Sequence, residues 1–192
     1  GRTLLAASLP ARMAFGMISL AIYFKVQKAT GSIAVAGLAT GLNGLAGAIT
    51  AGLRGAAIDR FGMRWPLRFL VPGYSIMMVV LSFATERTAL VLIATLLGLS
   101  APPINLSVRP LWKITVAKEK YRTAFALDTA TMNAVGVVAP VLATTIALSF
   151  SPALALQVCA FLMASGGFLL LQTWQVRSEE HTSELQSRET IS

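Results

Sequence analysis

Charged side chains are rare in the apolar parts of this sequence, so the few that occur there are the first candidates for chemistry. Arg12 lies in the first apolar segment, and Asp128 is the only acid clearly inside any such segment. At 1.5 Å per residue, Arg12 lies about 12 Å into its helix, where an unpaired charge costs about 3 kcal/mol. Its side chain therefore either extends to the near membrane interface or faces a central aqueous cavity and an anionic or polar substrate.

Asp128 also has two interpretations. It is either the salt-bridge partner of Arg109 or Arg122 near the interface, or a protonatable site that couples ion movement to another event. Asn43, an amide in an otherwise apolar segment, suits an interhelical hydrogen bond better than a ligand contact. The candidates to line a substrate path are Arg12, Asn43, Asn105, Arg109, Asp128 and Asn133.

The residue types needed for an embedded enzyme are missing from the apolar segments. No G-x-S-x-G sequence occurs, and His181, which lies in the polar C-terminal residues, is the single histidine. A serine nucleophile therefore has no histidine base. One cysteine, Cys159, and one aspartate in these segments do not make a metal-ligand set. We expect no catalytic residues, no cofactor and no metal, which leaves a channel-like or structural membrane protein as the main alternative to a transporter.

The composition is that of a membrane protein. Of 192 residues, 55% are hydrophobic and 12% are charged, which is too apolar for a soluble domain of this length. The formal net charge of +8 comes from basic residues that form short clusters between apolar runs. A nucleic-acid-binding protein would instead present them on a continuous face with interleaved aromatic residues. We therefore expect a lipid bilayer, and no nucleic acid, as a partner.

Six apolar segments, each near the length that crosses a bilayer, predict an all-α membrane protein. They cover residues 4–24, 29–53, 69–85, 88–108, 123–148 and 153–176. Basic clusters follow the second and fourth segments, whereas the turns at the other end carry only Lys25, Lys28 and Arg87. The positive-inside rule places both clusters and both termini in the cytoplasm. The sequence thus predicts a multi-pass protein of the cytoplasmic membrane.

Small residues in the second segment predict a close helix contact. Gly37, Gly41 and Gly44 recur at helical spacing on one face, so a neighbouring helix could approach closely there. Pro140 is expected to bend the fifth segment.

Two consecutive prolines near the end of the fourth segment predict a kink. Pro102 and Pro103 remove two N–H donors and displace the carbonyls of Gly98 and Leu99. These carbonyls need new partners, for which the nearby candidates are Ser100, Asn105, Ser107 and water.

Residues 55–68, GAAIDRFGMRWPLR, join the second and third segments by a short, strongly charged turn. Gly55, Asp59, Arg60, Gly62 and Arg64 read as G-x-x-x-D-R-x-G-x-R. Asp59 is the only acid among the arginines of this region, so it should pair with one of them or with a helix N-terminus. The pattern resembles the signature of the loop between the second and third transmembrane helices of the major facilitator superfamily of secondary transporters. Met63 departs from it, because the family usually has a basic residue there.

This resemblance, which covers residues 4–176, implies the N-terminal six-helix half of a major facilitator transporter. It implies two inverted three-helix repeats, a second half that this sequence lacks, and a substrate path between the halves. Gating by the loop at Asp59 would then accompany alternating access. Ala139 and Pro140 after Gly136 partly match a motif of drug antiporters in the family. Proton-coupled export of a small amphipathic molecule is therefore the first expectation, with uptake of a small metabolite left open.

Residues 177–192 differ in character from everything before them. They hold four of the eight acids and lack a hydrophobic period. Residues 177–187, RSEEHTSELQS, resemble the translation of a sequencing-library adapter. We expect this tail to be non-native and the sequence to be a fragment of a longer protein.

Overall fold

The computed structural model describes residues 2–61, 64–104 and 121–189, with side chains at 6–58, 60, 68–104 and 121–172. Six helices account for almost all of these residues. They are α1 (Arg2–Thr30), α2 (Ile33–Phe61), α3 (Arg64–Phe83), α4 (Arg87–Ser100), α6 (Tyr121–Ser149) and α7 (Pro152–Glu189).

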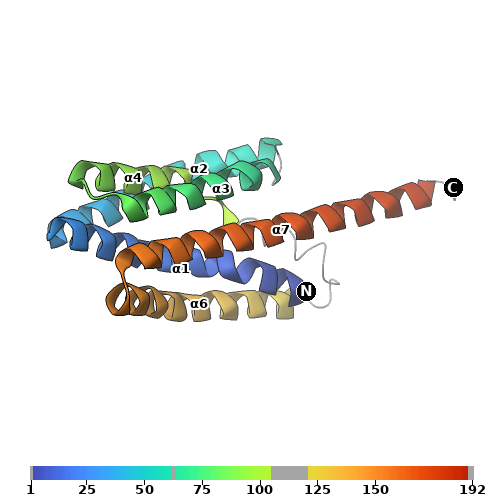
Figure 1. Ribbon diagram of the computed structural model, residues 1–192. Coiled ribbons are helices and arrows are strands. Elements are labelled where there is room, and N and C mark those ends of the chain that lie inside the picture. The colour runs from blue at the N-terminus through green and yellow to red at the C-terminus, as the bar shows by residue number, and fades with distance from the viewer. Residues whose placement is uncertain (1, 62–63, 105–120, 190–192) are drawn as a thin grey trace.

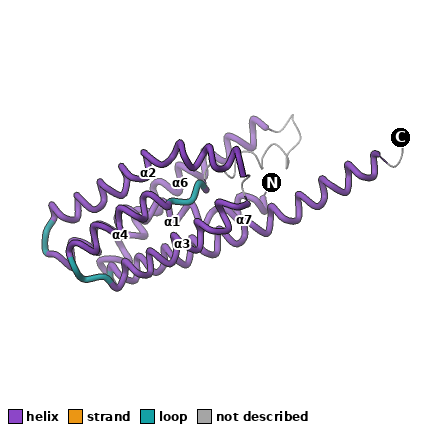
Figure 2. Tube along the Cα trace, turned by 90° about the horizontal axis from the view of Figure 1, so that it is seen from above, coloured by secondary structure: helices purple, strands orange, loops and turns teal. Residues whose placement is uncertain are grey.

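Helix α1 lies in the middle of the bundle. It packs against α2, α6 and α7, while α2 also packs against α4, and α3 packs against α7. Figure 1 shows α6 on one side of α1 and the group of α2, α3 and α4 on the other. The short turns after α1, α3 and α6 all lie at the same end of the bundle. Every helix of the described chain therefore runs roughly along one common axis, as Figure 2 also shows.

Local sequence explains two of these turns. Gly31 follows α1 with a φ of 67°, a conformation that glycine adopts without steric cost. The hydroxyl of Ser32 then accepts a hydrogen bond from the N–H of Val35 at 3.3 Å, and that of Ser151 accepts one from Leu154 at 3.1 Å. Serine before the first turn of a helix satisfies an N–H that has no partner within the helix. These turns thus end one helix and start the next.

Small side chains allow α1 to lie close to its neighbours. Ala11, Ala14 and Ala21 are completely buried. A Cβ added to Gly16 would lie 2.5 Å from the Cβ of Ala139 in α6, and one added to Gly166 in α7 would overlap Ala11. Helices in a bilayer gain much of their association energy from such close van der Waals packing. The bundle therefore depends on contacts that larger residues would prevent.

The glycine face predicted for α2 does not form a contact within the described chain. No described atom lies within 4 Å of a Cβ added at Gly37, Gly41 or Gly44. The face that meets α4 is rotated from this one and includes Asn43 and Gly47, which lies opposite Gly98. The seam at these three glycines therefore stays a prediction, because their spacing marks a face but does not say which neighbour it meets.

The fourth segment ends earlier than predicted. Instead of a kinked helix to residue 108, α4 ends at Ser100, and residues 101–103 are not helical. The prolines disfavour helical conformation in the residue that precedes them and remove the N–H groups that would continue the ladder. The hydroxyl of Ser100 donates to the carbonyl of Leu96 at 2.9 Å, so it does not supply the expected partner. Asn105 and Ser107 lie outside the described residues.

An arginine of α2 instead donates to the carbonyl of Gly98, which the prolines displace. Arg54 donates through Nη1 to the carbonyl of Gly98 at 3.1 Å and through Nη2 to that of Gly47 at 2.6 Å. A guanidinium near a helix C-terminus is also favoured by the negative end of the helix dipole. Arg54 thus caps α4 from a neighbouring helix. In the sequence, this arginine stands out only as one member of a basic cluster.

Four helices of the described chain are long and apolar enough to cross a membrane. The matching stretches are Ala6–Thr30, Ile33–Ile58, Tyr121–Ser149 and Pro152–Gln172. The apolar stretches in α3 and α4, Arg68–Phe83 and Arg87–Ser100, are shorter. Pro140 lies within α6, which continues through it to Ser149. Helix α7 extends to Glu189, past the predicted limit at residue 176, and its end projects beyond the other helices in Figure 1.

Candidate functional site

A buried ion pair joins α1 to α6. The Nη2 atom of Arg12 lies 2.7 Å from Oδ1 of Asp128, and the side chains are 2% and 10% exposed. These are the two charged residues that the structure buries among the side chains it describes. The pair places one positive and one negative charge between helices that are otherwise held together by alanine, glycine and valine.

Helix geometry brings the two charges together. Gly16 and Ala139 mark a level at which α1 and α6 lie close together, and both charged residues precede this level in their helices. A long side chain on a helix leans towards the N-terminus of that helix, so the guanidinium of Arg12 reaches back along α1. The ion pair joins the two side chains in this part of the α1 and α6 contact.

The hydrogen bonding of this ion pair is incomplete. The Nε and Nη1 atoms of Arg12 and Oδ1 of Asp128 are buried without a hydrogen-bond partner. The short Nη2 to Oδ1 distance therefore represents an ion pair whose N–H is poorly directed at the oxygen. A buried polar group without a partner costs about 1–3 kcal/mol, and more when it is charged. The guanidinium thus keeps unused donors inside the bundle.

This contact bears on two sequence-based expectations. Asp128 pairs with Arg12, whereas Arg122 is exposed. Arg109, the other expected partner, lies outside the described residues. Arg12 does not extend to the interface, since it is almost completely buried. In both cases the sequence left two alternatives open, and the structure shows that each residue meets a partner on a different helix.

The remaining candidates of the substrate path are dispersed. Asn43 donates through Nδ2 to the carbonyl of Ala94 in α4 at 2.8 Å, so it makes the expected interhelical hydrogen bond. Asn133 lies on the exposed side of α6. Asn105 lies outside the described residues. Of the six candidates, only Arg12 and Asp128 are brought into contact among the residues that the structure describes.

The charged loop between α2 and α3 is described only in part. Gly55 is half-buried near the end of α2, and Arg60 is exposed. Arg64 begins α3, but the side chains of Asp59 and Arg64, together with Gly62, lie outside the described residues. The pairing predicted for Asp59 therefore stays a prediction.

Comparison with known families now identifies the chain. The family model of the Major Facilitator Superfamily matches residues 4–190, which is nearly the whole sequence. The chain belongs to the major facilitator superfamily. A search of curated proteins and a search of solved structures gave no match.

Membership in the major facilitator superfamily fixes the general activity. The chain is an integral membrane protein and part of a membrane transporter. Members of this superfamily are transporters and not enzymes, which is consistent with the expected absence of catalytic residues. The matched range includes residues 177–190, and the non-native origin of the tail stays a prediction.

Proposed function

We propose that this chain is half of a secondary active transporter that exports a small amphipathic molecule across the cytoplasmic membrane in exchange for protons. The buried pair of Arg12 and Asp128 is the observation that carries the proposal. Asp128 can be neutralised by one proton, and its attraction for Arg12 is then lost. The guanidinium must then find other acceptors, so proton binding is linked to a movement of α1 against α6.

The incomplete hydrogen bonding of this pair favours a role in transport over a role in stabilising the fold. A buried ion pair stabilises a fold only when its geometry is good and its remaining donors are satisfied, and apolar residues of similar volume often do as well or better. Here the Nε and Nη1 atoms of Arg12 have no acceptor. Such a pair is easily exchanged for another set of contacts, which is what an alternating-access transporter requires and a channel or scaffold does not.

Open apolar surface on α2 and α6 suits a second six-helix half. Leu45 and Ile49 of α2 and Val137 and Val141 of α6 are all exposed, and the glycine face of α2 lies beside the first two. Small residues allow another helix to approach closely. We place the second half and the substrate path against these faces, with lipid against the remainder and both termini in the cytoplasm.

Transport can be tested in proteoliposomes that contain the full-length protein and ethidium as an amphipathic probe. An acidic lumen should drive several-fold accumulation of the dye, because protons leaving through the antiporter move the dye inwards. A protonophore should abolish the accumulation, and protein-free liposomes serve as the control. Equilibration of the dye without accumulation would instead favour the channel-like alternative.

The loop provides a separate test of gating, because the side chain of Asp59 is proposed to stabilise one state of the transporter. The change Asp59→Asn should lower transport about tenfold if it removes about 1.4 kcal/mol from that state, while equilibrium binding of the dye stays nearly unchanged. Asn105→Ala, in the proposed substrate path, should weaken binding instead. Loss of dye binding in Asp59→Asn would contradict the gating role, and transport at the parent rate would do the same.

A further inference from the structure

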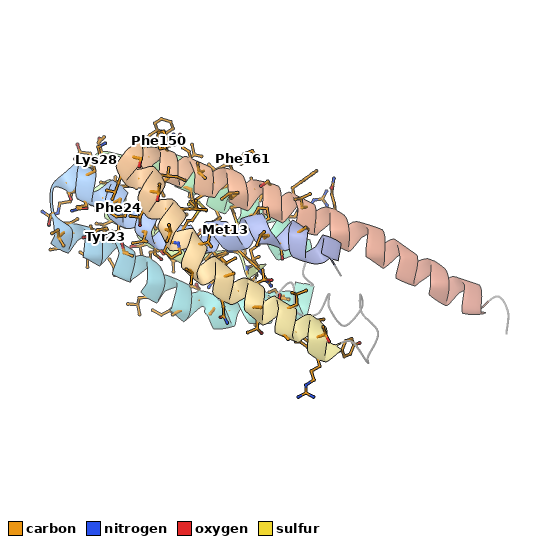
Figure 3. All side chains as sticks on the ribbon, turned by 90° about the horizontal axis from the view of Figure 1, so that it is seen from below. Met13, Tyr23, Phe24, Lys28, Phe150 and Phe161 are labelled. Carbon is orange, nitrogen blue, oxygen red and sulfur yellow. The ribbon has the colours of Figure 1, made fainter. Side chains whose placement is uncertain are left out.

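A second group of charges lies at the opposite end of the bundle from the loop at Asp59. A cavity of about 200 Å³ opens between the end of α1, the start of α7 and the turn between α3 and α4. Two lysines, Lys25 and Lys28, line it together with the hydroxyl-bearing residues Thr85 and Ser151. Figure 3 shows Lys28 near the end of α1, at the same end of the bundle as Phe150. The charge distribution of the sequence predicts that this end is external.

A hydrogen bond positions Lys25, and both lysines keep N–H donors that no described residue accepts. The Nζ atom of Lys25 donates to the carbonyl of Ser82 in α3 at 2.7 Å. An ammonium has three N–H donors, so Lys25 retains two for the cavity. Lys28 is exposed and makes no ion pair or hydrogen bond with another described residue. The hydroxyl of Ser151 accepts a bond from Leu154, which leaves its own O–H free to donate.

The charges around the cavity are not balanced. Glu86 and Arg87 follow Thr85, and both are exposed. Neither lysine forms an ion pair with Glu86 within the part of the chain that the structure describes. The first turn of α7 adds positive partial charge at the cavity wall, since Pro152 and Ala153 line it. The described residues that line the cavity therefore include two cations and no acid.

We propose that this cavity binds a phosphate group. Two lysines and two hydroxyl-bearing residues line it, and a phosphate has enough acceptor oxygens to meet donors from several directions. Lysine binds phosphate as a compact point charge. The phosphate can belong to the headgroup of an anionic lipid, because both lysines lie within six residues of the end of the apolar stretch Ala6–Thr30. It can also be a free phosphate ion.

The test uses the full-length protein and measures two probes. Native mass spectrometry measures retention of phosphatidylglycerol, with diacylglycerol as the phosphate-free lipid, and calorimetry in detergent measures inorganic phosphate. Lys28→Gln should weaken binding about fivefold, the effect of one basic residue at a membrane surface, and Lys25→Gln with Lys28→Gln about 25-fold. Arg87→Gln is the matched control, since it removes a cation at the same end without lining the cavity, and should change binding less than twofold.

The outcomes separate the two sources and decide the proposal. Lysine-dependent retention of phosphatidylglycerol alone assigns the cavity to a lipid headgroup, and lysine-dependent binding of inorganic phosphate assigns it to the free ion. Lys28→Gln keeps the test valid if loss of the Lys25 contact to Ser82 prevents folding, because its side chain is exposed. Binding that is unaffected by the lysine changes, or reduced equally by Arg87→Gln, would overturn the proposal.

Discussion

The change Asp128→Asn is expected to lower the free energy of unfolding by about 3–5 kcal/mol, because it leaves the guanidinium of Arg12 buried without its counter-charge. The penalty should be large because the Nε and Nη1 atoms of Arg12 already lack acceptors in the parent protein. Unfolding in mixed detergent micelles, followed by circular dichroism, measures it. Arg122→Gln is a suitable control, since it removes a charge from the exposed surface of the same helix and should have an effect below about 0.5 kcal/mol.

A double variant separates the structural role of this pair from its role in transport. Arg12→Met with Asp128→Leu removes both charges and fills the space with apolar atoms, so stability should return to that of the parent or exceed it. Dye accumulation driven by an acidic lumen should be lost in both the single and the double variant. If the stable double variant still transports in response to protons, then the pair only holds α1 to α6 and the proposed coupling is wrong.

The second large effect is expected at Gly98, where α2 and α4 approach most closely. A Cβ at this position would overlap the backbone oxygen of Asn43 and lie 3.0 Å from the Cβ of Ala46. Gly98→Ala must therefore push the helices apart and strain the hydrogen bond from Asn43 to Ala94. The expected loss is about 2–4 kcal/mol, the sum of overpacking and a weakened buried hydrogen bond, measured by the same unfolding assay.

Gly73→Ala provides the matched control, because it makes the same chemical change in α3 at a position that no described atom approaches within 4 Å, away from the faces proposed for the second half. Alanine favours a helix over glycine by about 1 kcal/mol, so this variant should be as stable as the parent or slightly more stable. Equal destabilisation by Gly73→Ala and Gly98→Ala would mean that the loss does not come from the close approach of α2 and α4.

Some features of the molecule follow from the order and type of its residues, because they depend on what a bilayer tolerates. A segment of about 20 apolar residues favours a helix in lipid, because a helix satisfies the backbone groups within the segment itself. Ser151 lies in the gap predicted between the fifth and sixth segments and caps the helix that follows, whereas the turn at Gly31 falls inside the predicted second segment. The G-x-x-x-D-R-x-G-x-R pattern pointed to the family that the comparison then showed. The lack of a histidine base or metal ligands in the apolar segments is likewise a property of composition.

The partners of particular side chains depended on the tertiary structure. In a soluble protein the apolar face of a helix marks the side that meets its neighbours. Lipid is as apolar as leucine, so the sequence of a transmembrane helix says little about which of its faces meets another helix. The glycines of α2 therefore predicted a face but not the helix that it meets. Arg54 was recognised as a charge, but its acceptors in α4 were not predicted. The ion pair of Arg12 and Asp128 joins helices far apart in the sequence. Periodicity places each residue on its own helix, and only the packing of α1 against α6 brought these two together.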